Sequence, residues 1–377
     1  MDSFIQAANQ RNEQEISFEQ NQTVIKNNAV DEELERLVAA QKASIKVVGC
    51  GGAGNNTINR IGEVGVAGLE TIAINTDAQD LLYTTARTKI LIGRALTRGM
   101  GAGSQPKIGE EAAREQATEI KSALGTPDLV FITAGMGGGT GTGSAAVVAE
   151  LAKAAGALTI GIVTVPFTME GNTRSENAQY GLAQLEKHVD TLVVIPNDKL
   201  FDLAPDLPVK TAFKIADEIL TNAVKGIAEL VTKPGLVNLD FADIKAVMGD
   251  GGVALIGVGE SNSENRAVEA VEKAITNPLL DVDIKGASGA LINVAGSSDL
   301  TLDEARSVVH AISDQLDEDA RIIWGTQISE DLGQTLQVML IVTGVHSTQI
   351  IGLGNSEERK QNEKKKIEDE LGIEFVN

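Results

Sequence analysis

The chain has 377 residues, with 53 acidic and 32 basic side chains and a net charge of −21. This length suits two folded domains better than one, and the acidic surplus argues against a nucleic-acid surface, which needs clustered Lys and Arg. Cys50 is the one cysteine, so no disulfide can form within the chain. The simplest interpretation is a cytoplasmic protein that binds no nucleic acid.

The start of the chain shows no sign of export or membrane insertion. Its first residues, MDSFIQAANQ, carry neither a basic segment nor an apolar core of the kind found in signal peptides. The longest apolar stretch, residues 157–167, is shorter than the roughly 20 residues that cross a bilayer. The Gln-, Asn- and Glu-rich composition before residue 31 predicts an N-terminal arm over residues 1–43 that is disordered or partly helical.

A first α/β domain is predicted over residues 44–209. Short runs rich in β-branched residues alternate there with helical patterns, as in a parallel α/β sheet. The runs are IKVV, TIAIN, KILI, LVFITAG, ALTIGIVTVPF and TLVVIP.

A long helix is predicted next, over residues 210–233, and its broad apolar surface indicates burial between two domains. A smaller α/β domain is then predicted over residues 234–350. It has helices from Phe241, Asn265 and Leu302, and its strands are VALIGVG, ALINVAG, RIIWG and LQVMLIVTGV.

Residues 351–377 begin with a charged run and end in the more apolar LGIEFVN. One interpretation is a solvated helix with a frayed end. The other is a charged linker that presents a short apolar C-terminal peptide to a partner.

The first strand leads directly into a glycine-rich loop, GCGGAG, which begins at Gly49 and matches GxGxxG, and Asp77 follows 23 residues after Gly54. Taken alone, this pattern is typical of a dinucleotide fold. Glycines let backbone amides approach an anion, and the next helix offers its positive N-terminus. The loop therefore identifies a phosphate site without identifying the cofactor.

A second loop is more unusual, because residues 135–143 hold six glycines in nine positions before a helix. Two such loops on one sheet can hold several phosphates, whereas a dinucleotide fold normally uses one. The chain has no Gly-Lys dipeptide and therefore no P-loop. A third loop, residues 99–103, is placed to close over a terminal phosphate.

Asn238, Asp240 and Asp243 form an NxDxxD motif after the long helix. The two aspartates share one face of the next helix, so they are candidates for catalysis, but they also suit a helix cap and its first turn. His188, His310 and His346 lie in no motif that indicates a general base or metal ligand.

These motifs resemble the FtsZ family of tubulin-like cell-division GTPases in its archaeal form, over residues 44–345. The segments that carry the resemblance are GCGGAGNN, NTDAQ, GAGSQP, GGGTGTG, PFTMEGNTR, IPNDKL and NLDFAD. The resemblance implies a Rossmann-like parallel-sheet GTPase domain, a long central helix, a smaller α/β C-terminal activation domain and GTP-dependent head-to-tail filaments.

The resemblance also implies which residues bind GTP or GDP. Glu170 and Arg174 are expected at the ribose, Asn197, Phe213 and Asp217 at the base, and Asp77 belongs to the same predicted nucleotide site. The residues expected around the phosphates are Gly51, Gly52, Ala53, Gly54, Asn55, Asn56, Gly101, Ala102, Gly103, Gly138, Gly139, Thr140, Gly141, Thr142 and Gly143.

Guanine presents two neighbouring N–H donors, which one ionised carboxylate can accept together. Asp217 suits this role, although its spacing also fits an exposed helix residue, and Phe213 at its position is more often a core residue than a stacking surface.

In this family the NxDxxD loop reaches the nucleotide of a neighbouring subunit, so hydrolysis is expected to require assembly. Asp240 and Asp243 would orient and polarise water, while Mg²⁺, with ligands left unassigned, would supply the main electrostatic stabilisation. We expect a division ring at mid-cell in the cytoplasm, with the C-terminal peptide bound to a membrane adaptor and no direct membrane insertion.

Three alternatives remain. A nicotinamide-dependent oxidoreductase would use GxGxxG and Asp77, but it leaves the second glycine loop unexplained. A tubulin-like filament for cell shape would share the chemistry and differ in biological role. A nucleotide-binding filament with negligible turnover would differ in the rate of phosphate release.

Overall fold

The computed structural model describes residues 43–66, 68–200, 209–232, 240–277, 279, 284, 287–317, 319–329 and 332–345. These residues belong to one compact unit that begins at Ala43. The predicted N-terminal arm up to residue 42, the C-terminal linker with its apolar peptide, and Asn238 lie outside the described ranges. Among the described residues, no helix is both long and apolar enough to cross a membrane.

Ten strands of the described chain form one continuous sheet in the order β3-β2-β1-β4-β5-β6-β7-β10-β8-β9. Every neighbouring pair is parallel except that β10 runs antiparallel to β7 and β8. The strands are β1 (Ile45–Cys50), β2 (Leu69–Asn75), β3 (Thr88–Leu91), β4 (Leu129–Gly135), β5 (Leu158–Val165), β6 (Thr191–Pro196), β7 (Gly252–Ser261), β8 (Gly289–Gly296), β9 (Arg321–Ile328) and β10 (Leu336–Thr343).

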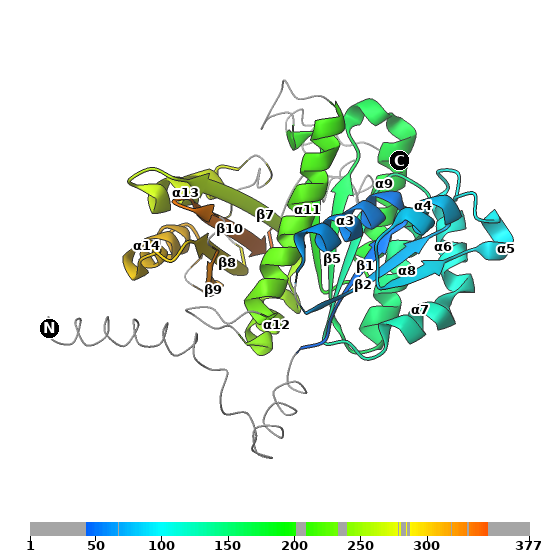
Figure 1. Ribbon diagram of the computed structural model, residues 1–377, viewed down its shortest axis with the longest axis horizontal. Coiled ribbons are helices and arrows are strands. Elements are labelled where there is room, and N and C mark those ends of the chain that lie inside the picture. The colour runs from blue at the N-terminus through cyan, green and yellow to red at the C-terminus, as the bar shows by residue number, and fades with distance from the viewer. Residues whose placement is uncertain are drawn as a thin grey trace, which may run out of the picture. The chain divides into compact units, whose positions relative to one another are not determined.

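Helices cover both faces of this sheet, which explains why its central strands are continuous apolar runs (Figure 1). The helices are α3 (Gly51–Val64), α4 (Ala78–Tyr83), α5 (Arg94–Thr97), α6 (Pro106–Glu115), α7 (Ala117–Leu124), α8 (Thr140–Ala154), α9 (Asn172–Leu185), α11 (Val209–Thr232), α12 (Phe241–Met248), α13 (Arg266–Ile275) and α14 (Leu302–Ser313), with a 3₁₀ turn η1 (Thr168–Glu170).

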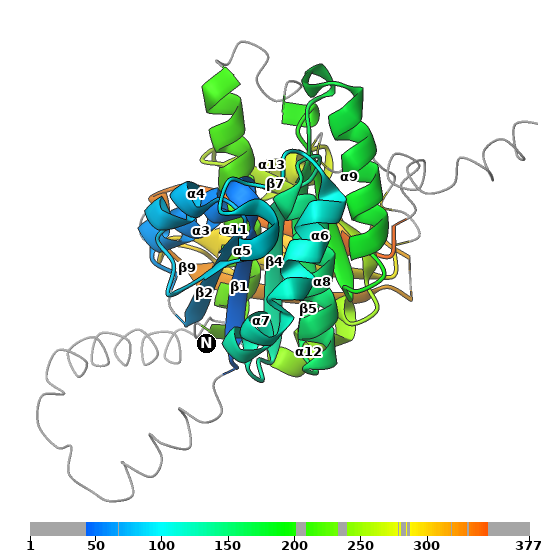
Figure 2. The same ribbon diagram turned by 90° about the vertical axis from the view of Figure 1, so that its right-hand side faces the viewer.

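Alternate residues of the parallel strands enter two separate cores. Val47 packs in the core that α3 and α11 cover, whereas its neighbour Val48 packs in the core under α6, α7, α8 and α9. Figure 2 shows the latter four helices together on one face of the sheet. A third core lies under α13 and α14, against β7, β8 and β10.

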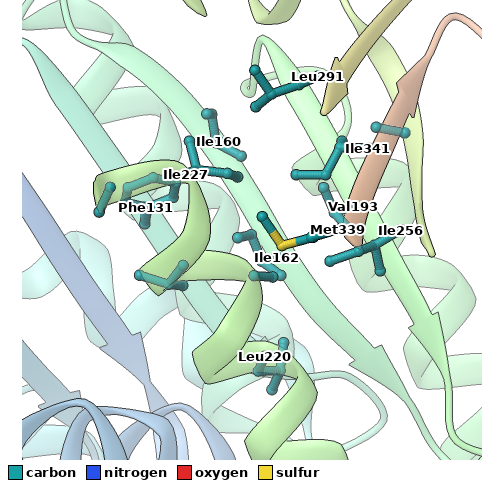
Figure 3. Close-up of a cluster of buried hydrophobic side chains, with 14 of the residues drawn as sticks. Phe131, Ile160, Ile162, Val193, Leu220, Ile227, Ile256, Leu291, Met339 and Ile341 are labelled. Carbon is teal, nitrogen blue, oxygen red and sulfur yellow. The ribbon is translucent and has the colours of Figure 1, made fainter. Parts of the chain in front are cut away.

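The long helix α11 joins the two halves of the molecule. Leu220 and Ile227 of α11 lie in one buried cluster with Phe131 and Ile160 of the parallel strands and with Met339 of β10 (Figure 3). The predicted burial of this helix is confirmed, and the fold is the predicted one: a parallel-sheet domain, a central helix and a smaller α/β domain.

Candidate functional site

A cavity of about 360 Å³ opens at the carboxyl ends of β1, β4, β5 and β6. This edge of a parallel α/β sheet is where ligands normally bind. The lining residues are Cys50, Gly52, Ala53, Asn56, Gly135, Met136, Gly138, Gly139, Thr140, Gly141, Thr164, Pro166, Glu170, Arg174, Asn197, Phe213, Ala216 and Asp217. The structure therefore brings twelve of the predicted nucleotide residues, from four separate segments of the first domain and from α11, to one cavity.

Two helix N-termini meet at the inner end of the cavity. Because β1 and β4 are adjacent and parallel, α3 begins at Gly51 and α8 at Thr140 at the same edge of the sheet. The first amides of a helix have no partner within that helix, and its dipole favours negative charge there. This end of the cavity is built to bind an anion such as a polyphosphate.

The predicted phosphate residues that do not line the cavity support those that do. Gly54 packs so closely on β4 that an added Cβ would lie 2.4 Å from the carbonyl oxygen of Thr133. The Thr142 hydroxyl accepts a hydrogen bond from the Gly137 amide at 3.0 Å. Asn55 donates to the Asp80 carboxylate at 3.1 Å. Gly51 and Gly143 likewise approach other backbone segments.

The third loop packs against the second loop without reaching the cavity. Ala102 is buried, and a Cβ added to Gly139 would lie 2.8 Å from the Ala102 Cβ. The Gly101 amide donates to the carbonyl of Thr76 at 3.2 Å. Gly101, Ala102 and Gly103 therefore form a layer behind the residues that line the cavity.

Asp77 does not line the cavity. Its carboxylate caps α4 and accepts hydrogen bonds from the amides of Gln79 and Asp80, at 2.9 Å and 3.1 Å. This is the ordinary work of an aspartate at a helix N-cap.

One wall of the cavity carries an ion pair between Glu170 and Arg174. The two residues are four positions apart, across the junction of η1 and α9. Glu170 also accepts a hydrogen bond from the Phe167 amide at 2.9 Å, which fixes its carboxylate. The Arg174 guanidinium remains half exposed and can donate further hydrogen bonds.

The other end of the cavity can hold a planar base. Phe213 is 42% exposed, and it contacts the buried Phe167 edge to face, with 5.2 Å between ring centroids. Phe213 is thus not a core residue, and it has a ring face available to a ligand. Asn197 is 5% exposed, and its side-chain oxygen has no hydrogen-bond partner among the described residues.

Asp217 lies one turn after Phe213 on α11, and both line the cavity. Burial raises the pKa of Asp217 to about 6, because a low-dielectric environment disfavours the charged carboxylate. No Lys or Arg of the described chain pairs with it. A half-buried carboxylate without a partner suits a ligand that presents N–H donors.

Six lining residues are not among the predicted nucleotide residues: Cys50, Gly135 and Met136, which lie in the two predicted phosphate loops, and Thr164, Pro166 and Ala216. Thr164 and Pro166 end β5, so the rule that parallel strands end at one edge identifies them once the strand order is known. The Cys50 side chain is buried. Burial raises the pKa of its thiol to about 12, so the thiol is neutral at pH 7.

The aspartates of the NxDxxD motif form a capping box at the start of α12. Asp240 accepts a hydrogen bond from the Asp243 amide at 2.8 Å, and the Asp243 carboxylate accepts one from the Asp240 amide at 3.3 Å. The helix-cap alternative therefore describes their contacts within the chain, and Asp240 is exposed while Asp243 is partly buried. Their catalytic role stays a prediction.

Within one chain these aspartates lie far from the cavity. The last residue of α12, Met248, accepts a hydrogen bond from Thr191, the first residue of β6, so α12 ends beside the amino end of that strand. The cavity is at the carboxyl end of β6. Between the two sites runs α11, whose 24 residues correspond to about 36 Å of helix (Figure 1).

Comparisons with known proteins agree with this architecture. Residues 44–205 match the GTPase domain of the Tubulin/FtsZ family, and residues 252–346 match the C-terminal domain of the FtsZ family. Cell division protein FtsZ 1 of Methanocaldococcus jannaschii is 62% identical over 84% of this chain and 87% of that protein. FtsZ 1 of Thermococcus kodakarensis is 60% identical over 84% of this chain and 85% of that protein.

Solved structures extend the comparison. The empty FtsZ dimer of M. jannaschii has a TM-score of 0.81 and 61% identity, covering 85% of this chain and 93% of that one. CetZ1 from Haloferax volcanii, a GDP-bound monomer, has a TM-score of 0.72 and 23% identity, covering 84% of this chain and 99% of that one, so it shares the fold alone. The chain belongs to the FtsZ family of tubulin-like, filament-forming GTPases of cell division.

Proposed function

We propose that this GTPase hydrolyses GTP where two copies meet head to tail, in filaments that form a division ring. The observation that carries the proposal is the separation of the two halves of the site. The cavity lies at the carboxyl edge of the sheet, and Asp240 and Asp243 lie at the opposite edge. Stacking copies head to tail places one edge against the other, and because such a contact does not close, it makes a filament.

The cavity has a place for each part of a guanine nucleotide. The N-termini of α3 and α8 would hold the phosphates, Glu170 and Arg174 the ribose, and Phe213, Asn197 and Asp217 the base. An ionised Asp217 would accept both guanine donors, whereas the ring nitrogen of adenine would face it as another acceptor. This predicts a strong preference for GTP over ATP.

Asp240 and Asp243 would act on the nucleotide of the neighbouring copy. Carboxylates on an exposed helix start can accept hydrogen bonds from a water molecule and orient it toward the terminal phosphate. Carboxylates are weak bases in general, so the proposed role is to position and polarise this water. Neither residue can do this within its own chain, because the cavity is at the other edge of the sheet.

A Mg²⁺ ion fits the cavity as an ion bound mainly to the nucleotide. The described residues contain no cluster of three acidic, His or Cys side chains, and the phosphate end offers the Thr140 hydroxyl and backbone groups. Mg²⁺ in nucleotide sites commonly keeps several waters and binds phosphate oxygens. The ion would neutralise charge on the phosphates, while the chain orients the nucleotide.

The carboxyl edge of the sheet carries exposed apolar side chains that a neighbouring copy would cover. Met100, beside Gly101 in the third loop, is 78% exposed, and Met169, beside Glu170, is 67% exposed. Large exposed apolar residues near a binding site indicate an interaction surface. They support self-association at this edge.

The remaining parts of the proposal rest on the sequence. The C-terminal peptide LGIEFVN, presented on a charged linker, would bind a membrane adaptor and hold the ring at mid-cell in the cytoplasm. We also keep the division into a GTP-binding domain over 44–209, a central helix over 210–233 and an activation domain over 234–350.

Assembly-dependent turnover is the property that tests this function. Phosphate release per chain should rise steeply with protein concentration and should appear together with light scattering and pelletable polymer. ATP in place of GTP is the control and should produce neither. Turnover per chain that is independent of concentration would contradict hydrolysis between copies, and polymer without phosphate release would favour the filament with negligible turnover.

A further inference from the structure

Asn177 connects two of the glycine-rich loops from the outside. It lies on α9, one turn after Arg174, and its side-chain amide donates to the carbonyl oxygen of Gly137 at 3.2 Å and to that of Ser104 at 3.0 Å. Gly137 belongs to the second loop, and Ser104 directly follows the third loop. One side chain therefore holds both loops, and Asn177 itself does not line the cavity.

The bond to Gly137 fixes the direction of an amide that faces the ligand. In a trans peptide the C=O of one residue and the N–H of the next point in opposite directions. Because Asn177 holds the Gly137 carbonyl on the α9 side, the Gly138 N–H points away from α9. Gly138 lines the cavity, and its amide donates to no other group of the described residues. It is thus a free donor for a phosphate oxygen.

The bond to Ser104 holds a loop in a conformation that its sequence does not favour. Ser104 has a φ of 58°, in the left-handed region that residues with a Cβ rarely adopt. Such a conformation persists only where surrounding contacts maintain it. Asn177 supplies one of these contacts, and the Gln105 amide, bonded to the Ala102 carbonyl at 3.1 Å, supplies another.

Helix α9 is a rigid base for this connection. It packs on α8 at Gly181, where an added Cβ would lie 2.4 Å from the methyl group of Thr142. Thr142 in turn accepts the Gly137 amide. The carbonyl and the amide of Gly137 are therefore both held, one by α9 and the other by α8.

We propose that Asn177 is a positioning residue for nucleotide binding, which orients the Gly138 amide and ties the third loop to the second. This inference rests on the proposed function, because the ligand that Asn177 helps to bind is the phosphate chain of GTP. Its role is to organise the ground-state site, so its loss should raise KM far more than it lowers kcat.

The test compares three substitutions at this position. Asn177→Leu keeps the size and removes the donors, Asn177→Asp places a carboxylate against two carbonyls, and Asn177→Gln keeps the amide on a longer arm. Gln179→Leu is the matched control, since a residue two positions along lies on a different face of the helix. Binding of GTP and GDP is measured by titration below the concentration at which filaments form, alongside thermal unfolding of the nucleotide-free proteins.

We expect Asn177→Leu to weaken GTP binding about tenfold and Asn177→Asp to weaken it more, with unfolding temperatures close to that of the control. Asn177→Gln should recover part of the affinity. Unchanged GTP affinity in Asn177→Leu would overturn the proposal. The proposal would also be overturned if Asn177→Leu lost GTP affinity together with a lower unfolding temperature and Asn177→Gln recovered none of that affinity. Failure of the unmodified protein to bind GTP would instead overturn the proposed function.

Discussion

Gly51 and Gly141 meet backbone to backbone. A Cβ added to Gly51 would lie 2.7 Å from the Gly141 amide nitrogen, and one added to Gly141 would lie 2.8 Å from the Cys50 carbonyl oxygen. Gly51 also has a φ of 70°, which favours glycine. The two phosphate loops thus form one interlocked structure, and this contact explains why glycine occupies Gly51, which does not line the cavity, as well as Gly141, which does.

Gly141→Ala should therefore damage folding as well as binding. The new methyl group has no space beside Cys50, and overpacking of this kind costs about 1–3 kcal/mol. Gly138→Ala is the comparison, because nothing lies within 4 Å of a Cβ at that position. It should unfold like the unmodified protein and lose GTP affinity only. Urea unfolding and GTP titration separate the two effects, and equal stability of both variants would contradict the interlocked arrangement.

The raised pKa of Asp217 predicts a pH dependence of GTP binding. With a pKa of about 6 in the nucleotide-free protein, the carboxylate becomes protonated as the pH falls below 6 and can no longer accept both guanine donors. Affinity should then fall by up to about tenfold per pH unit. Asp217→Asn should bind GTP at least about tenfold more weakly at pH 7.5 and lose this pH dependence. If GTP affinity varied with pH in the same way in the unmodified protein and in Asp217→Asn, Asp217 would not be a residue that binds the base.

The same carboxylate should destabilise the nucleotide-free protein at neutral pH. Because burial raises its pKa above the unfolded value of 3.8, the folded state holds the proton more tightly, and the free energy of unfolding falls as the pH rises from about 4 to 6. Asp217→Asn should therefore be more stable by about 1–2 kcal/mol at pH 7.5, after allowance for partial exposure. The difference should vanish near pH 4, and denaturation at both pH values checks it.

The sequence predicts local features of this chain better than contacts between distant segments. Runs such as LVFITAG show a buried strand, and the glycine-rich segments indicate phosphate loops, because those signals lie in neighbouring residues. Asn177 and Ser104 are separated by 73 positions, and no pattern in either segment indicates their contact. Asp77 shows the opposite case, since its spacing suggested a ligand role while local helix capping accounts for its hydrogen bonds.

A buried arginine should dominate the stability of the smaller domain. Arg266 is 8% exposed and pairs with Glu304 at 2.6 Å and with Asp299 at 3.0 Å. It also donates to the carbonyl of Gln334 at 2.9 Å. The hydrogen bond from Arg266 lowers the pKa of Glu304, and hydrogen bonds from Ser297 and then from Arg266 lower the pKa of Asp299. Arg266→Ala would remove a buried side chain and leave the Gln334 carbonyl and the partly buried Glu304 carboxylate without this donor.

We expect Arg266→Ala to cost about 1.5–3 kcal/mol of folding free energy, the scale of hydrogen bonds that involve a charged group. Arg87→Ala is the control, because its bond to Glu70 at 3.1 Å is between exposed side chains and should contribute less than about 1 kcal/mol. Urea unfolding followed by the fluorescence of Trp324, which packs against this core, reports on the smaller domain. Equal losses in the two variants would show that the buried pairs add nothing beyond a surface pair.

Asp240 allows its capping role to be separated from its proposed catalytic role. Asparagine caps a helix as well as aspartate does, so Asp240→Asn should keep the hydrogen bond to the Asp243 amide and lose only the charge. It should bind GTP and form filaments with normal stability, while phosphate release falls by roughly 10², the scale of losing a catalytic positioning group. Unchanged turnover in this variant would leave Asp240 with the capping role alone.

Mixing two defective chains tests whether the site is shared between copies. Thr140→Ala, at the start of α8, should bind GTP poorly while its Asp240 stays intact. When such a chain follows an Asp240→Asn chain in one filament, an intact aspartate meets a properly bound GTP, so the mixture should release phosphate faster than either variant alone. Co-pelleting of differently tagged chains shows that they assemble together. Co-assembly without recovered turnover would mean that Asp240 does not act across the interface, because every other requirement for hydrolysis would then be present.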